Sequence, residues 1–160
     1  MTPMAVKLQY STLIDAPYDL VWEVTNDVAR WTDLFPGHAS VDVIHQEGDT
    51  VRFRITKHPD EQGRVMTWVS DRTMYRDEGE ARAVRVETGP FEYMHLRWVY
   101  EDLPEGVRLT WHYEFTAKAD APYDDTWMKA HFDESAPREL ERVRNTLEAR
   151  ARALAGEPVR

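Results

Sequence analysis

The stretch Met66-Thr67-Trp68-Val69-Ser70-Asp71-Arg72-Thr73-Met74 alternates residue by residue, and its large apolar side chains recur on one face. Alternation with a period of two is typical of a β-strand whose two faces meet different surroundings. The face that carries Trp68 also carries Ser70 and Arg72, so we expect all three to point inward. A buried arginine without a partner is costly. Two interpretations stay open: Arg72 reaches water from the strand end, or it faces an internal cavity and a polar ligand.

Similar strand patterns lie on both sides of this stretch. The predicted strands are Val6–Asp15, Ser40–Gln46, Val51–Lys57, Trp68–Arg72, Arg82–Glu87, Phe91–Asp102 and Val107–Lys118. From the second strand onward, connections rich in Gly, Pro, Asp and Glu join each strand to the next. Successive strands joined by short turns predict an antiparallel meander.

Helical patterns precede and follow this meander. Asp15-Ala16-Pro17 is typical of a helix start with Asp15 as the cap, and a second short helix is expected over Val28–Leu34. The long segment Asp124–Leu154 has an apolar stripe at helical spacing, which Pro137 is expected to interrupt and kink. The stripe consists of Met128, Phe132, Ala136, Val143, Leu147 and Leu154. Only this helix is long enough to cover the sheet. We therefore predict an α+β fold: a seven-stranded curved antiparallel sheet around a long C-terminal helix, with two short helices after strand 1.

Length and composition narrow the class of protein. A chain of 160 residues predicts one domain over 1–160, with an ordered core at about 6–154. The chain has no cysteine, which excludes disulfides and thiolate chemistry, and its net charge of −9 argues against general nucleic-acid binding. We expect no membrane partner, because no apolar run approaches the ~20 residues of a membrane span. The first residues lack a signal-peptide pattern, so a cytoplasmic location is expected. The spacing of the six histidines predicts no metal site.

Aromatic residues are abundant, with six tryptophans, seven tyrosines and five phenylalanines. Such residues either fill a small core or line a cavity for a flat ligand. Five of them come from separate predicted elements and should converge between sheet and helix. We expect these five to line an elongated internal pocket open at one end: Trp31, Phe35, Trp68, Trp98 and Trp111.

Four short motifs suggest a family. They are Ile14-Asp15-Ala16-Pro17 with Val21-Trp22-Glu23-Val24, then Trp31-Thr32-Asp33-Leu34-Phe35-Pro36, Trp68-Val69-Ser70-Asp71-Arg72, and Glu139-Leu140-Glu141-Arg142-Val143. With them the chain resembles the single-domain aromatase/cyclases of bacterial type II polyketide synthases, of the tetracenomycin and spore-pigment type within the START-like helix-grip superfamily. The resemblance covers nearly the whole chain, and the Trp-x-Ser-x-Arg strand is its most specific part.

The resemblance implies a defined activity. Such enzymes fold a poly-β-ketone tethered to an acyl carrier protein, direct the first-ring aldol cyclisation (C9–C14), and promote dehydration to an aromatic ring without a cofactor. The resemblance also implies two kinds of partner, the acyl carrier protein and the other components of the minimal polyketide synthase. Arg72 matches the family's key arginine. The implied substrate-binding residues are Trp31, Phe35, Trp68, Ser70, Met94, Trp98, Trp111 and Tyr113. The tetracenomycin-type pattern has tyrosine, glutamine and asparagine where this chain has His38, Tyr113 and Glu139.

Aldol chemistry needs a donor to the developing oxyanion and a separate group that moves protons. Arg72 suits the first role but is a poor proton carrier. His38 and Glu139 are the candidates for the second role. The alternatives are that His38 is a solvated loop residue, and that Glu139 is a rim carboxylate or the ion-pair partner of Arg72.

Two further expectations concern partners and function. An acidic enzyme that docks an acidic carrier protein needs a local basic patch, for which Arg30, Arg76 and Arg82 are candidates. The rival function is a non-catalytic binding or transport protein for a flat hydrophobic metabolite, because fold alone does not separate the two.

Overall fold

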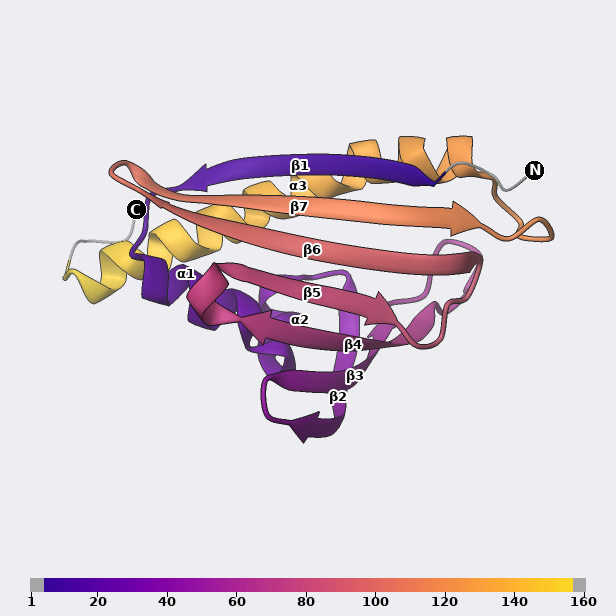
Figure 1. Ribbon diagram of the computed structural model, residues 1–160, viewed down its shortest axis with the longest axis horizontal. Coiled ribbons are helices and arrows are strands. Elements are labelled where there is room, and N and C mark those ends of the chain that lie inside the picture. The colour runs from indigo at the N-terminus through magenta and orange to yellow at the C-terminus, as the bar shows by residue number, and fades with distance from the viewer. Residues whose placement is uncertain (1–4, 157–160) are drawn as a thin grey trace.

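A curved antiparallel sheet of seven strands forms one layer of the molecule in the computed structural model, which describes residues 5–156 (Figure 1). The spatial order of the strands is β1-β7-β6-β5-β4-β3-β2. Strands β2 to β7 form the predicted meander, and β1 pairs with β7. The strands are β1 (Val6–Ile14), β2 (His38–Glu47), β3 (Thr50–Lys57), β4 (Thr67–Tyr75), β5 (Glu80–Arg85), β6 (Phe91–Leu103) and β7 (Gly106–Ala117). The predicted strand number and direction are confirmed.

Helices cover one face of this sheet. The long helix α3 (Asp125–Leu154) lies mainly along β1 and β7, and α1 (Tyr18–Asn26) sits near its C-terminal end (Figure 1). The predicted second helix is split into a 3₁₀ turn, η1 (Val28–Arg30), and the single turn α2 (Trp31–Leu34). A further 3₁₀ turn, η2 (Arg76–Glu78), joins β4 to β5. The predicted α+β arrangement is therefore confirmed, while residues 1–4 and 157–160, outside the predicted ordered core, also lie outside the described residues.

The predicted helix start at Asp15 is wrong. The N-cap position of α1 is Pro17, and no side chain bonds to the exposed N–H groups of its first turn. The Asp15 backbone N–H instead donates to Glu148 Oε2 on α3, at 2.9 Å. This bond ties the β1–α1 junction to the C-terminal half of α3.

The predicted interruption of the long helix is also wrong, because α3 continues without a break through Pro137. A proline inside a helix removes one backbone hydrogen bond. Pro137 and Asp133, whose carbonyl loses that partner, both lie on the exposed side of α3. The start of α3 follows the usual rule, since Asp124 accepts a hydrogen bond from the Trp127 backbone N–H at 2.8 Å.

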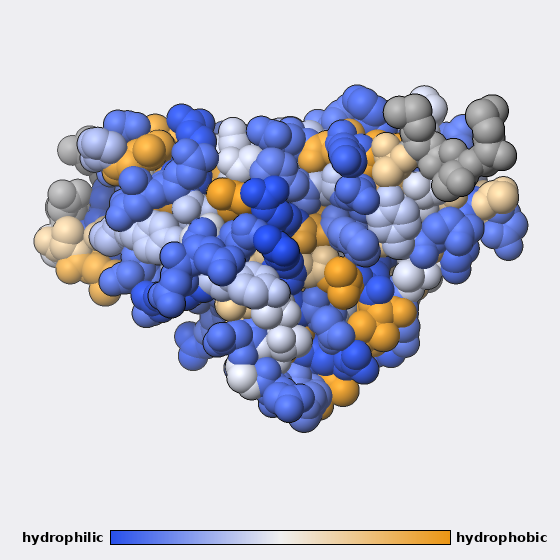
Figure 2. Space-filling view, viewed as in Figure 1, coloured by the Kyte–Doolittle hydropathy of each residue, from blue (hydrophilic) through white to orange (hydrophobic). Residues whose placement is uncertain are grey.

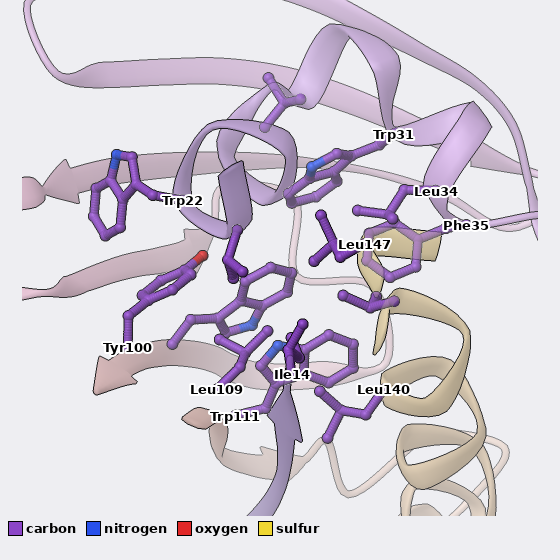
Figure 3. Packing of buried hydrophobic residues seen from close by; sticks show 14 of the residues in the cluster. Ile14, Trp22, Trp31, Leu34, Phe35, Tyr100, Leu109, Trp111, Leu140 and Leu147 are labelled. Carbon is purple, nitrogen blue, oxygen red and sulfur yellow. The ribbon is translucent and has the colours of Figure 1, made fainter. Parts of the chain in front are cut away.

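Two clusters of buried residues form the core. The larger one lies between α1, α2, the C-terminal half of α3 and the adjoining parts of the sheet (Figure 3). The smaller one gathers Leu8, Phe91, Met94, Phe115 and Met128. The apolar stripe predicted on α3 is confirmed except at Leu154, which is 76% exposed. Tyr113 packs against both clusters and marks the place where they meet.

The outer face of the sheet differs from this core. Figure 2 shows that the molecular surface in this view is mainly hydrophilic, with scattered apolar side chains between the polar ones. Exposed apolar residues of the strands include Ile44 on β2 and Val84 on β5. The alternation read from the sequence thus separates a packed inner face from a mostly polar outer face.

Candidate functional site

Arg72 is the largest fully buried side chain of the described residues, with only 1% of it exposed. It lies in the middle of β4, where the alternation of Trp68, Ser70 and Arg72 turns it toward the inner face of the sheet. Its Nε and Nη2 atoms donate to Asn26 Oδ1 at 3.0 and 2.8 Å. The interpretation in which Arg72 reaches water from a strand end is therefore wrong.

Two tryptophan rings hold the Arg72 guanidinium in place. Its central carbon lies 4.3 Å from the centre of the Trp98 ring and 5.2 Å from that of Trp31. These two rings are nearly parallel at 5.7 Å, and Trp111 stacks on Trp98 at 4.7 Å. A cation gains electrostatic attraction from aromatic faces, and this gain grows when water is absent.

Neutral groups surround the charge on its remaining side. Asn26 donates from its amide nitrogen to the Trp22 carbonyl at 2.9 Å and to the Tyr100 hydroxyl at 3.2 Å. The Tyr100 hydroxyl is also 2.7 Å from Thr25 Oγ1. Burial lowers the pKa of Arg72 from its usual high value, whereas the neighbouring Tyr100 raises it. The side chain stays a cation, because arginine is not deprotonated in proteins.

Glu139 is not the ion-pair partner of Arg72, contrary to one of the interpretations drawn from the sequence. The side-chain acceptor on Arg72 is the neutral amide of Asn26. Glu139 lies on α3 with its Oε2 buried and without a hydrogen-bond partner among the described residues. A positive charge that has no bonded carboxylate keeps its full electrostatic effect for another anion.

His38 is the second titratable group at this end of the core. It begins β2, its ring centre is 5.3 Å from that of Phe35 and 6.5 Å from that of Trp31, and its Nδ1 is buried without a partner in residues 5–156. Burial, helped by the nearby charge of Lys57, lowers the pKa of His38 to about 4. The interpretation as a solvated loop residue is therefore wrong. At neutral pH the imidazole is uncharged, so it suits a proton acceptor better than a proton donor.

The aromatic residues predicted to line an open pocket converge as expected, but four of them pack against one another. Trp31 contacts Phe35 edge to face at 5.5 Å, and Phe35 lies 6.1 Å from Trp111. Figure 3 shows the rings of Trp31, Phe35 and Trp111 in the region between the N-terminal helices, the sheet and α3. Two surface hollows lie elsewhere, on the outer face of the sheet and beside η2, and neither is lined by these four residues. The prediction of an open pocket between them is wrong for this structure.

The remaining predicted site residues lie farther along the inner face. Trp68 is half-buried against the larger cluster, Ser70 is buried, and Met94 belongs to the smaller cluster. Tyr113, between the clusters, has a pKa raised by burial and by the charge of Glu139. Trp68, Tyr113 and Glu139 point inward yet keep some exposed surface. This region is therefore the part of the inner face that is less completely closed.

Sequence reasoning misses three polar residues of the site. It singles out neither Asn26 nor Tyr100. Arg85 stands opposite Ser70 in the β4–β5 register and has its guanidinium over the Trp68 ring at 4.3 Å. Its inward direction follows from the row Ala81, Ala83, Arg85, but the predicted strand begins at Arg82 and leaves that row incomplete.

Two features are absent from the described residues 5–156. Within them, no group of three His, Cys, Asp or Glu side chains lies close enough to hold a metal ion. None of the helices in that range combines the length and hydropathy needed to cross a membrane.

Comparison with known proteins assigns the family. A family model described as "Polyketide cyclase / dehydrase and lipid transport" matches residues 14–144. The chain belongs to this family. One family relative, from Streptomyces cyaneus, is 46% identical over 145 residues, which cover 91% of this chain and 95% of the relative. Another, from Streptomyces halstedii, is 52% identical over 108 residues, which cover 68% of this chain and 99% of the relative. Each is named "Putative polyketide cyclase".

Solved structures show how the family fold recurs. The Zhui aromatase/cyclase from Streptomyces sp. R1128 superimposes with a TM-score of 0.85 at 23% identity, over 97% of this chain and all of that one. The di-domain aromatase/cyclase BexL gives 0.75 at 23% identity, over 90% of this chain and 47% of that chain. A START superfamily protein from Mycobacterium smegmatis gives 0.68 at 15% identity, over 92% of this chain and 98% of that chain. The predicted START-like helix-grip fold is confirmed.

Proposed function

We propose that this protein is a polyketide aromatase/cyclase. It folds a poly-β-ketone carried by an acyl carrier protein, directs the first aldol ring closure, between C9 and C14, and promotes loss of water to give an aromatic ring. The observation that carries the proposal is the Arg72 guanidinium, which is buried among two tryptophans and a neutral amide with no carboxylate bonded to it in the described residues. A fold built only for stability gains nothing from such a charge, whereas a reaction that develops an oxyanion does.

The residues suggest a division of labour in the aldol step. His38, uncharged at neutral pH, takes a proton from the carbon between two carbonyls and leaves an enolate. The enolate carbon attacks a carbonyl carbon farther along the chain, and the oxygen of that carbonyl becomes an alkoxide. Arg72 stabilises the alkoxide, because preorganised donors act most strongly where water is excluded. The alkoxide takes back the proton that His38 removed, and loss of this hydroxyl with a hydrogen from the neighbouring carbon releases one water. Enolisation of the remaining ring carbonyls then completes the aromatic ring.

A substrate reaches Arg72 only if part of the structure around it moves. With 1% of its side chain exposed, Arg72 lies behind the Trp31 and Trp98 rings. Trp31 is carried by α2, a helix of four residues next to a 3₁₀ turn of three. We therefore assign the movement that admits substrate to the η1–α2 segment.

Reconstitution tests the function. The full chain is added to a minimal polyketide synthase that makes a poly-β-ketone of fixed length, and the products are compared with and without it. We expect the mixture of spontaneously cyclised products to give way to one C9–C14 aromatic product. The rival function, a non-catalytic carrier of flat hydrophobic metabolites, predicts an unchanged product mixture together with tight binding of the finished aromatic product. The proposal is of a cytoplasmic enzyme, since its substrate stays attached to the synthase's carrier protein.

A further inference from the structure

A second arginine lies on the inner face of the sheet, and the aldol steps above do not use it. Arg85 is the last residue of β5 and follows Ala81 and Ala83 on the inward row. In the β4–β5 register, Arg85 stands opposite Ser70 and Ala83 stands opposite Arg72. The two inward arginines are therefore two residues apart along neighbouring strands, or ~7 Å along the strand direction.

The Arg85 guanidinium has aromatic partners but no bonded acceptor in the described part of the chain. Its central carbon lies 4.3 Å from the centre of the Trp68 ring and 5.0 Å from that of Phe91. Within residues 5–156, its contacts include neither a salt bridge nor a side-chain hydrogen bond. Aromatic rings cover the faces of a guanidinium, whereas its N–H donors all lie in its plane. The donors of Arg85 are thus left for another acceptor.

The surroundings of Arg85 are largely apolar, so burying its charge there destabilises the fold. Trp68 packs against the larger core cluster, Phe91 belongs to the smaller one, and Tyr113 contacts both. Burial in this position lowers the pKa of Arg85 to about 10, so the side chain is still a cation at neutral pH. A methionine would fill the same space without the cost of desolvating a charge. A buried charge without a bonded partner breaks the usual rule for protein interiors and adds nothing to stability, so it indicates a functional role.

We propose that Arg85 is a second oxyanion site, which binds one enolised carbonyl oxygen of the polyketide chain and so determines which carbons reach Arg72. This inference rests on the proposed function. The two guanidinium groups are directed apart, because Arg72 bonds to Asn26 on α1 and Arg85 lies over Phe91 at the start of β6. A poly-β-ketone carries a carbonyl on every second carbon, so a chain held at Arg85 presents a fixed interior carbonyl to Arg72.

Arg72 and Arg85 then have separate roles. Without Arg72, ring closure is expected to lose its electrostatic assistance. Without Arg85, ring closure is expected to continue, but between several pairs of carbons, because the chain slides relative to Arg72. Ser70, opposite Arg85, and the Tyr113 hydroxyl are the polar neighbours that complete the subsite.

A binding experiment tests the site independently of polyketide synthesis. The probes are the anion 1-hydroxy-2-naphthoate and neutral 2-naphthol, and binding is followed by tryptophan fluorescence in the full chain. Arg85→Met should weaken binding of the anion about tenfold or more, because a charge-assisted hydrogen bond is lost, and leave 2-naphthol almost unchanged. Arg85→Lys should restore part of the anion affinity. Equal weakening of both probes, or no weakening of either, overturns the proposal.

The reconstituted synthase supplies the second readout. With Arg85→Met, we expect ring closure to continue and the aromatic product to be divided among several ring positions. Arg97→Met on the outer face of β6, where Arg97 pairs with Glu80 at 3.3 Å, is the matched control and should keep one product. If wild type leaves the product mixture unchanged, the proposed function fails. If wild type gives one product and Arg85→Met gives the same single product, only the Arg85 inference fails. Thermal melts establish whether each variant is folded. If Arg85→Met does not fold, the same product analysis is made with Arg85→Lys.

Discussion

Arg72 combines a high cost of burial with weak compensation. A guanidinium removed from water is normally paired with a carboxylate, but here its acceptor is the amide oxygen of Asn26. The Trp31 and Trp98 faces recover part of the desolvation cost. The charge is thus held at one place by neutral groups, which is the preorganisation that oxyanion stabilisation needs.

Substitution of Arg72 should therefore separate activity from stability. Arg72→Met should lower the rate of directed cyclisation by roughly a hundredfold to a thousandfold, or about 2.7–4 kcal/mol, the usual loss for one oxyanion donor. Its free energy of unfolding should change by no more than about 2 kcal/mol, because the relief of a buried charge offsets the lost donor to Asn26. Arg72→Lys should recover part of the rate, since lysine keeps the charge but not the planar fork.

Urea denaturation and product analysis check both halves of this prediction. A variant that fails to fold would assign Arg72 to structure, and one with full cyclisation activity would move the site elsewhere. Arg97→Met is again the control, because that arginine is on the exposed outer face.

His38 predicts a particular response to acid. Its pKa is about 4 in the folded protein, below the ordinary 6.5 that applies when the chain is unfolded. As pH falls from 6.5 toward 4, the unfolded imidazole takes up a proton and the folded one does not, so stability is lost over this interval. The His38→Phe variant lacks this contribution. As the pH falls from 6.5 toward 4, the free energy of unfolding of the variant should therefore decrease less than that of wild type.

Denaturant titrations of both proteins at a series of pH values, from about 7 down to about 4, measure the difference. Parallel pH profiles would show that His38 titrates normally, and its assignment as a buried neutral base would then be wrong. The other histidines are present in both proteins and cancel in the comparison.

Sequence alone predicts which side chains point inward but not what they touch. The period of two fixes the faces of β4, and this pattern is enough to place Arg72 on the inner face. Its partner Asn26 lies 46 residues away at the end of a helix, and no local pattern connects them. The same limit applies to the aromatic residues, whose convergence is predictable from the strand faces but whose mutual stacking is not.

At the scale of elements, we propose that the η1–α2 segment moves to give a substrate access to Arg72. Its 3₁₀ turn and single helical turn have few internal hydrogen bonds, such as those from Arg30 N to Asp27 O at 3.0 Å and from Phe35 N to Trp31 O at 2.7 Å. It is held chiefly by burying Trp31, Leu34 and Phe35. A short element that depends on side-chain packing opens at a lower free energy than the central strands.

Amide hydrogen exchange should therefore distinguish this segment from the sheet. We expect peptides over residues 28–35 to exchange faster than those of β6 and β7, and to slow down when 1-hydroxy-2-naphthoate is bound. Protection equal to that of β6 in the free protein would contradict the assignment of the segment as the moving part.

Element boundaries show where local rules give way to tertiary structure. Alternation predicts the strands, because their two faces meet different surroundings. The predicted start of α1 is misplaced, because the N-cap position is Pro17 and the Asp15 backbone N–H donates to Glu148 on α3. The continuity of α3 through Pro137 depends on that residue facing water, which a sequence pattern does not report.

At the scale of the whole molecule, charge limits how a carrier protein can dock. The chain has a net charge of −9, so long-range attraction to an acidic carrier protein is not expected. Of the three arginines considered for a local basic patch, Arg82 pairs with Glu80 at 2.7 Å and Arg76 pairs with Asp19 at 3.0 Å. The hollow beside Arg76 also contains several carboxylates.

Arg30 is therefore the candidate that best keeps its charge for a partner. It is exposed at the end of η1, next to the segment assigned to admit substrate, and the salt bridges of the described residues leave it unpaired. We expect Arg30→Glu to weaken carrier-protein binding, and Arg82→Glu, whose charge is already offset by Glu80, to have less effect. Wild-type affinity should fall as salt rises, because exposed charges farther apart than ~10 Å are screened at about 0.1 M ionic strength. Titration of the acyl carrier protein at several salt concentrations measures both effects, and an affinity that ignores salt and Arg30 would exclude docking at this end of the molecule.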